Sequence, residues 1–312
     1  MSRLIHRIAS LIRGIASLIR GIASLIHRIA SLIMKIMIRT WRVTPTQNIP
    51  LDNDDLSLDD VTRQLPDGYY STFRTFDGCQ RVLGLSAHLR RLYDPVSAPE
   101  VSHSFLRQQM RTLLEPYRPG EARIRAVMTK QGEVYLAIAP LSLLPREIYE
   151  KGVQVETTEL EREQPRLKST AFIGRSDSER KHIAQQGIFE ALLVKDGNIL
   201  EGMTSNFFYV LARDAAQIPF SIGTARADIL LGITRKTVID LARGRGLEVK
   251  YQPLKRDQLA AVSEAFLTSS SRGIVPVIEI DDVPIGQGRP GPLTKELLQA
   301  YDEYVIQKAE KI

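Results

Sequence analysis

The sequence predicts a protein of the α/β class, in which strands and helices are mixed in both halves of the chain. Runs of β-branched and aromatic residues are broken by turn residues, as in 121–141 and 188–202, and such runs indicate hairpins. Other segments carry apolar residues at helical spacing, as in 232–246 and 293–309. The body of the chain shows no internal repeat, which excludes a solenoid.

The first half starts with a strand at 37–43, where apolar residues follow Met37, and continues with a helix-like pattern at 56–65. The next segment, 68–85, reads as two strands around the Asp77-Gly78 turn. A helix follows at 86–96, then a hairpin at 121–141 with "KQGE" at its turn, and a strand at 152–160.

The second half opens with a charged, proline-containing stretch, "EREQPRLKST", that breaks the pattern. A helix is expected near 175–187, then a hairpin around Asp196-Gly197 and an aromatic strand at 205–211. A helix is expected at 232–246 and should end at Gly244 or Gly246, because glycine commonly terminates helices. The segment 264–281 is expected to be a strand, and 293–309 the last helix.

Composition excludes several classes of protein. The single cysteine, Cys79, allows no intrachain disulfide, and the five scattered histidines do not have the spacing of a metal site, so no metal is expected. The net charge of +6 equals the six basic residues of 1–36, and the other 36 Lys and Arg are matched by 36 Asp and Glu. A neutral body gives no reason to expect nucleic acid as a partner.

Residues 1–36 repeat a seven-residue unit, "RIASLIRGIASLIRGIASLIHRIASLI". Its apolar face could form a short coiled coil or lie on an anionic membrane surface. Such regular repetition is also what a tandem duplication in coding DNA produces. We therefore expect a basic extension outside the fold, with membrane contact only if the repeat is part of the cellular protein, and otherwise a cytoplasmic protein. We expect a smaller domain at 37–157, a linker at 158–166 and a larger domain at 167–312.

Four stretches of the body and one lysine could together bind a phosphorylated cofactor. Lys168 supplies an amine, and Glu201 supplies a carboxylate at the end of a hairpin strand. "ILLGITR" places free backbone amides at a helix N-terminus, which is a ready anion site. "TSSSRG" adds hydroxyl groups at a strand end, and Arg91 in "HLRRL" adds a guanidinium that suits phosphate. Each stretch alone has an ordinary structural explanation; together they match pyridoxal 5′-phosphate.

With these motifs the sequence resembles the fold-type IV pyridoxal-phosphate enzymes. This family includes branched-chain aminotransferases, D-amino-acid aminotransferases and aminodeoxychorismate lyases. The resemblance covers roughly residues 37–308 and rests on "HLRRL", "LEGMTSNFF", "ILLGITR" and "SSSRGIVPV". It implies a two-domain fold like that of D-amino-acid aminotransferase, with the cofactor at the domain interface, in a homodimer.

The resemblance also implies a role for each matching residue. Lys168 lies 33 residues before Glu201, as in the family, whereas Lys181 lies only 20 before it, so Lys168 is the expected catalytic residue and Schiff-base amine. Glu201 is expected on the pyridine nitrogen, and Ser270 and Ser271 on the substrate carboxylate. The expected cofactor-binding residues are Arg91, Lys168, Glu201, Ser205, Asn206, Ile233, Thr234 and Ser270.

The sequence departs from the family on the substrate side. Ala171 and Ile173 stand where many members have Asn or Tyr, and Ser71 replaces a common glutamate. The favoured function is amino-group transfer between an amino acid and a 2-keto acid. An aminodeoxychorismate lyase-type β-elimination on the same cofactor is the alternative, and a catalytically silent cofactor-binding protein is a third hypothesis.

Overall fold

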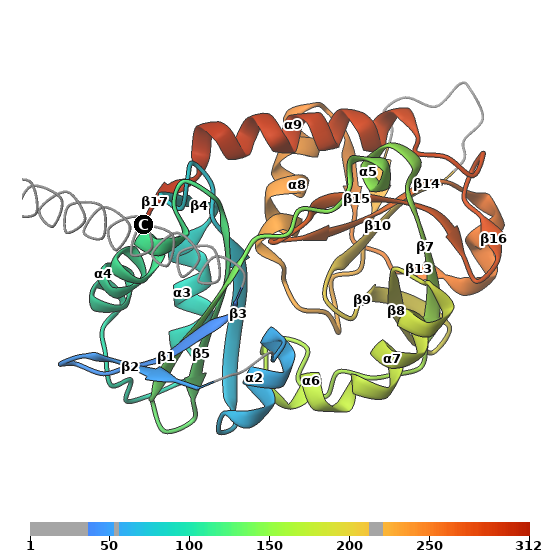
Figure 1. The fold of residues 1–312 in the computed structure, drawn as a ribbon. Helices are drawn as coiled ribbons and strands as arrows, with labels where there is room; N and C mark the ends of the chain where they lie inside the picture. The colour runs from blue at the N-terminus through green and yellow to red at the C-terminus, as the bar shows by residue number, and fades with distance from the viewer. Residues whose placement is uncertain (1–36, 53–55, 212–220) are drawn as a thin grey trace, which may run out of the picture.

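The computed structural model describes residues 37–52, 56–211 and 221–312, so the repeat at 1–36 lies outside the described residues. Two lobes lie side by side, each built around its own sheet (Figure 1). The first lobe has a five-stranded sheet in the order β2-β1-β6-β5-β3, and every neighbouring pair is antiparallel. Its strands are β1 (Arg39–Val43), β2 (Asn48–Leu51), β3 (Gly68–Arg74), β5 (Ala122–Thr129) and β6 (Val134–Pro140).

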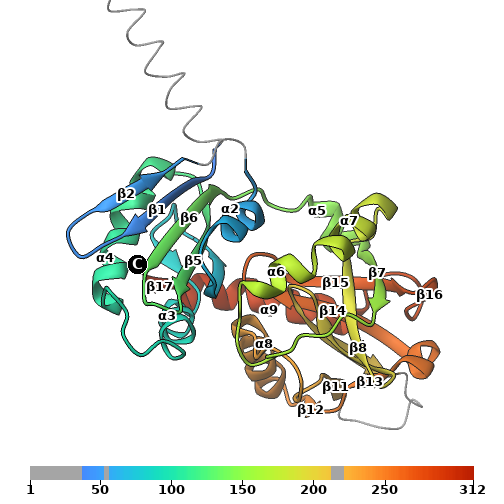
Figure 2. The same ribbon diagram turned by 90° about the horizontal axis from the view of Figure 1, so that it is seen from below.

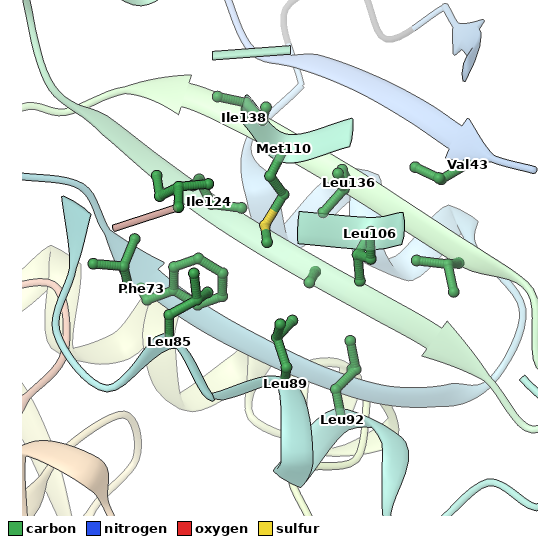
Figure 3. Packing of buried hydrophobic residues seen from close by; sticks show 14 of the residues in the cluster. Val43, Phe73, Leu85, Leu89, Leu92, Leu106, Met110, Ile124, Leu136 and Ile138 are labelled. Carbon is green, nitrogen blue, oxygen red and sulfur yellow. The ribbon is translucent and has the colours of Figure 1, made fainter. Parts of the chain in front are cut away.

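One face of this sheet forms the core of the first lobe together with the helices beside it. The helices on this face are α3 (Leu85–Tyr93), α4 (His103–Leu114) and the short 3₁₀ helix η1 (Glu115–Tyr117), whereas α2 (Leu58–Gln64) packs on the other face against Ala137 and Ala139. Alternate residues of the strands point to α3 and α4, because side chains alternate between the faces of a strand. Figure 3 shows this packing, which includes Val43, Phe73, Leu85, Leu89, Leu92, Leu106, Met110, Ile124, Leu136 and Ile138.

The second lobe has a ten-stranded mixed sheet with a path β12-β11-β10-β14-β15-β7-β8-β9-β13. A further pairing between β9 and β10 joins Glu201 to Asn206 and closes part of the sheet into a ring of strands. Its strands are β7 (Val153–Thr158), β8 (Glu190–Lys195), β9 (Asn198–Gly202), β10 (Asn206–Leu211), β11 (Ser221–Gly223), β12 (Glu248–Lys250), β13 (Leu254–Lys255), β14 (Val262–Ser269), β15 (Gly273–Ile280) and β16 (Val283–Pro284).

Helices cover this second sheet. The two long helices, α8 (Ile233–Gly244) and α9 (Pro292–Lys308), pack on it through a shared core. In this core the rings of Phe208 and Phe266 stack with their centroids 5.0 Å apart. Figure 1 shows α9 running across the top of the molecule. The helices are α5 (Arg146–Lys151), α6 (Ala171–Arg175), α7 (Asp177–Gln186), α8 (Ile233–Gly244), η2 (Arg256–Ala261) and α9 (Pro292–Lys308).

The chain passes from the first sheet to the second earlier than the sequence predicts. The predicted linker was 158–166, but β7 lies between β8 and β15 and is parallel to both, so the crossing is the segment 141–152. A short strand pattern such as "GVQVETTEL" does not indicate which sheet the strand will join. The division into domains that fold independently stays a prediction.

The end of α9 returns to the first lobe. There β17 (Glu310–Lys311) pairs with β4 (Arg81–Val82), and the Ile312 side chain is buried in the first core. The lobes are therefore connected twice, as the two views show (Figures 1 and 2). Within the described ranges, no helix is long and apolar enough to cross a membrane.

Candidate active site

A cavity of about 340 Å³ lies between the two lobes and is lined by residues of both. All the residues that the sequence singles out for cofactor or substrate lie on its wall. The first lobe contributes one of them from α3, and the second lobe contributes the rest from loops, strand ends and the start of α8. They are Arg91, Lys168, Glu201, Ser205, Asn206, Ile233, Thr234, Ser270 and Ser271.

Lys168 reaches the cavity from the loop between β7 and α6. The loop is fixed to β3 because Tyr70 donates its amide to the Lys168 carbonyl at 2.9 Å and Tyr69 forms a β-bridge with Ser169. The Lys168 ammonium lies 4.7 Å from the centre of the Tyr70 ring, and in the described chain it has no hydrogen bond or ion pair. Burial lowers the pKa of this amine, and nearby guanidinium groups lower it further. An unpaired amine with a lowered pKa suits a nucleophile or a base.

Glu201 ends β9 and is 1% exposed. Its carboxylate accepts three hydrogen bonds of 3.0 Å, from Arg162 Nε, Asn206 Nδ2 and the Leu230 amide. Burial raises the pKa of Glu201 to about 7, although Arg162 acts in the opposite direction. The pairing of β9 with β10 sets Glu201 directly beside Asn206, so the ring closure of the sheet positions this carboxylate.

The start of α8 forms a cradle for an anion. Gly232 precedes the helix, and the amides of Ile233 and Thr234 have no backbone partner among the described residues. The Arg91 guanidinium donates to the Leu231 carbonyl and so lies beside these amides. Free amides at a helix N-terminus together with a guanidinium suit a phosphate group.

Several buried polar atoms on the cavity wall lack partners within the described chain. They are Ser205 Oγ, Thr268 Oγ1 and Arg162 Nη1. Buried polar groups are normally hydrogen-bonded, so these atoms indicate a bound polar group. The wall offers an amine for an aldehyde, a carboxylate for a pyridine nitrogen and a helix start for a phosphate, so its residues fit pyridoxal 5′-phosphate. No group of three metal-ligating side chains occurs in the described ranges.

Other residues on the wall were missed by the sequence analysis. Ser71, the departure noted there, points away from the cavity, and its hydroxyl lies 2.7 Å from His88 Nδ1. The neighbouring positions of β3 and β5 line the cavity instead. Polar residues at every second position of a strand were the available signal. The missed residues include Asp59, Tyr70, Thr72, Arg123, Arg125, Arg162, Arg180, Thr268 and Arg272.

Comparisons with known proteins agree with this geometry. The family model for class IV amino-transferases matches residues 68–280. A D-alanine aminotransferase from Bacillus licheniformis is 25% identical over 82% of this chain and 94% of its own length. A putative branched-chain-amino-acid aminotransferase from Methanocaldococcus jannaschii is 29% identical over 76% of this chain and 86% of its own.

The fold is also that of solved aminotransferases. The crystal structure of a putative branched-chain amino acid aminotransferase from Thermotoga maritima has a TM-score of 0.69 and 25% sequence identity. The match covers 86% of this chain and 96% of that one, which confirms the predicted fold class. Other structures of this fold were determined with pyridoxamine 5′-phosphate or with pyridoxal phosphate bound. Fold, cavity and family model together lead to one conclusion: the chain belongs to the class IV aminotransferase family and is a pyridoxal-phosphate-dependent aminotransferase.

Proposed function

We propose that Lys168 is the catalytic amine of this aminotransferase and that Glu201 and the α8 cradle hold the cofactor. The observation that supports this most is that the partnerless Lys168 amine and the buried Glu201 carboxylate share one cavity. Pyridoxal phosphate, when bound, stabilises negative charge at the α-carbon of an amino acid. The substrates are an amino acid and a 2-keto acid.

The phosphate would be held by the free amides of Ile233 and Thr234, by the Arg91 guanidinium and by the Ser270 hydroxyl. Ser205 and Asn206 would shape the wall beside the ring, since Asn206 already bridges Glu201 and the Leu230 carbonyl. The turn at Ser270 and Ser271 would bind the substrate carboxylate through its amides and hydroxyls.

Glu201 would accept a hydrogen bond from the protonated pyridine nitrogen. A positive partner favours the charged form of a carboxylate, so such a ligand would offset the burial that raises the pKa of Glu201 to about 7. Arg162 and Asn206 would keep the carboxylate oriented, because each already donates to it.

Lys168 Nζ would move protons at the substrate's α-carbon. Burial lowers the pKa of the amine, which favours its neutral, basic form. The neutral amine would take the proton from the α-carbon of the amino acid and pass it on to the carbon of the cofactor that had carried the aldehyde. With the keto acid the transfer would run in reverse, and the amine would move a proton from that carbon to the α-carbon.

The direct test compares Lys168→Ala with Lys181→Ala. Lys181 is the matched control, because its side chain is 73% exposed and pairs with Asp177. With added pyridoxal phosphate, wild type and Lys181→Ala should show visible cofactor absorbance, and borohydride should fix the cofactor to Lys168. Lys168→Ala should show neither property. Equal fixation in Lys168→Ala would refute the assignment.

The same preparation separates the alternative functions. An aminotransferase changes its cofactor absorbance on adding an amino acid and needs a keto acid for repeated turnover. Repeated turnover without a keto acid would indicate a lyase. Cofactor binding with no response to any amino acid would indicate a silent binding protein.

We further propose that the enzyme is a cytoplasmic homodimer, as the family resemblance implies. Light scattering of the purified holoenzyme should give twice the mass of the chain, and cell fractionation should place it with cytoplasmic markers. A fully active monomer, or recovery with membranes, would overturn the respective proposal.

A further inference from the structure

A second hollow, of about 470 Å³, lies on the second lobe and shares no lining residue with the catalytic cavity. Four separate segments form it: the loop before Lys168, the turn between β8 and β9, the loop between β11 and α8, and the connection from β12 to β13. Pockets of this size bind small molecules. The hollow is therefore large enough for a ligand of its own.

Charged side chains of both signs line this hollow without pairing with each other. The cations are Arg166, Lys195 and Arg226, and the carboxylates are Asp196 and Asp228. None of these five forms an ion pair within the described part of the chain. Guanidinium and ammonium groups suit a phosphate, whereas carboxylates accept hydrogen bonds from hydroxyl groups. The hollow therefore offers partners for a ligand that carries both a phosphate and hydroxyls.

Tyr251 gives the hollow a flat aromatic wall. The residue is 38% exposed, and its hydroxyl accepts a hydrogen bond of 3.0 Å from Arg243 Nη2. The guanidinium groups of Arg235 and Arg243 each lie 5.7 Å from the ring centre. Neither of these arginines lines the hollow, so the ring is positioned by groups outside it. An exposed aromatic ring held in this way suits stacking with a nucleobase.

Three guanidinium groups beside the hollow disfavour one another's charge. Arg235 is 5% exposed, and its Nε is buried without a partner among the described residues. Burial lowers the pKa of Arg235, and the like charges of Arg166 and Arg226 act in the same direction. An anion bound between Arg166 and Arg226 would relieve this repulsion. The cluster therefore gains more from a phosphate than an isolated surface arginine does.

We propose that this hollow is a binding site for a nucleoside phosphate. Arg166 and Arg226 hold the phosphate, and the base lies on the Tyr251 ring. Asp196 and Asp228 accept hydrogen bonds from the sugar hydroxyls. A phosphorylated form of the cofactor's own precursor also combines a ring, a hydroxyl and a phosphate, so the test compares the two sources. The site does not depend on the proposed function of Lys168, because it contains none of the catalytic residues.

A ligand in this hollow would act on the catalytic cavity through two loops. Arg166 stands two residues before Lys168 and donates from Nη2 to the Arg226 carbonyl at 2.9 Å. The loop of Arg226 continues to Leu230, whose amide donates to Glu201 at 3.0 Å. A phosphate on both arginines would restrain both loops together, so the ligand and the cofactor would each strengthen the binding of the other. This coupling, unlike the site itself, rests on the proposed function.

Calorimetry with the borohydride-reduced holoenzyme measures the site directly, because the catalytic cavity is then filled. The probes are AMP, adenosine, ribose 5-phosphate and pyridoxine 5′-phosphate. AMP should bind at least about tenfold more tightly than adenosine, which lacks the phosphate, or ribose 5-phosphate, which lacks the base. Equal binding of ribose 5-phosphate and AMP would overturn the role of the ring. Tighter binding of pyridoxine 5′-phosphate than of AMP would overturn the nucleoside assignment in favour of the cofactor's precursor.

Variants locate the bound nucleotide. Arg226→Gln and Tyr251→Ala should each weaken AMP binding by about tenfold. Tyr251→Phe keeps the ring and should retain most of the affinity. Arg289→Gln is the matched control and should bind as wild type, because Arg289 is exposed and in the described chain its guanidinium bonds only to Gln287. The melting temperature and the cofactor absorbance establish that each variant is folded.

A titration of the apoprotein with pyridoxal phosphate tests the coupling. Saturating AMP should lower the dissociation constant of the cofactor by about fivefold in wild type and leave it unchanged in Arg226→Gln. Weaker cofactor binding with AMP would mean competition for the catalytic cavity and would overturn the inference. Unchanged AMP affinity in Arg226→Gln and Tyr251→Ala would do the same. Failure of the proposed function looks different, because then Lys168→Ala still fixes the cofactor, while the loss of AMP binding in Arg226→Gln remains.

Discussion

Replacing Arg162 with Met should make the free energy of unfolding of the apoprotein decrease as the pH rises, over a pH range in which that of the wild type is constant. Arg162 is the ion partner of Glu201, and the side chains are 5% and 2% exposed. The Arg162 guanidinium also lies 3.8 Å from the centre of the Phe172 ring. Methionine keeps an apolar contact with that ring but removes the charge.

The sign of the effect follows from Glu201. Its pKa is 4.5 before folding and is raised by burial to about 7, so the folded state binds the extra proton. The free energy of unfolding therefore falls as pH rises through this range and becomes level above it. Without Arg162 the pKa of Glu201 rises further, and the decline continues above pH 7.

The magnitude has two bounds. Breaking a buried ion pair costs about 3–5 kcal/mol if the remaining charge persists. Protonation limits this loss, and one proton changes stability by about 1.4 kcal/mol per pH unit. Between about pH 7 and about pH 9 the variant should therefore lose up to about 3 kcal/mol more than wild type.

Urea unfolding of the cofactor-free protein at several pH values, followed by circular dichroism, measures this slope. Arg180→Met is the matched control. Its partner Asp59 is half-buried, and Arg125 and Arg180 outweigh that partial burial and hold the pKa of Asp59 below its usual value, so Asp59 stays charged in this range. Parallel stability curves for Arg162→Met and wild type would refute the reasoning.

Two further substitutions test the cradle and the second core. A Cβ on Gly232 would lie 2.1 Å from Asn206 Oδ1, so Gly232→Ala should displace Asn206 and weaken cofactor binding at least about tenfold in a spectroscopic titration. Gly244→Ala, where nothing lies within 4 Å, should bind as wild type, and equal affinity of both variants would contradict this. Phe266→Ala removes a fully buried ring stacked on Phe208 and should lower the free energy of unfolding by about 3–5 kcal/mol. A loss below about 1 kcal/mol in denaturant titrations would contradict tight packing there.

The sequence predicted the fold class and the family because both depend on local patterns. Hairpins at 121–141 and 188–202 correspond to β5–β6 and β8–β9, since each has alternating strands and a marked turn. The motifs around Arg91, Glu201 and Ile233 could be recognised within a few residues of sequence. The structure places them around one cavity, and their roles stay predictions until the variants are measured.

The other residues that line the cavity could not be predicted in the same way. Arg123 and Arg125 reach the cavity only because β5 pairs with β3 in a particular register, and that register joins residues about fifty positions apart. Arg162 was read as part of a linker, yet it folds back onto Glu201. The strand pattern of β7 gave no indication of the sheet it joins. Each miss concerns a long-range pairing, for which a single sequence holds little local signal.

The double connection between the lobes has a consequence for the geometry of the cavity. The wall with Arg123 and the loop with Lys168 are held together by the crossing at 141–152, by the β17–β4 pair and by the bridge from Tyr69 to Ser169. Sliding one wall past the other would break these pairings, so the spacing of the two groups is nearly constant. The width of the cavity is therefore set mainly by the backbone pairings around it.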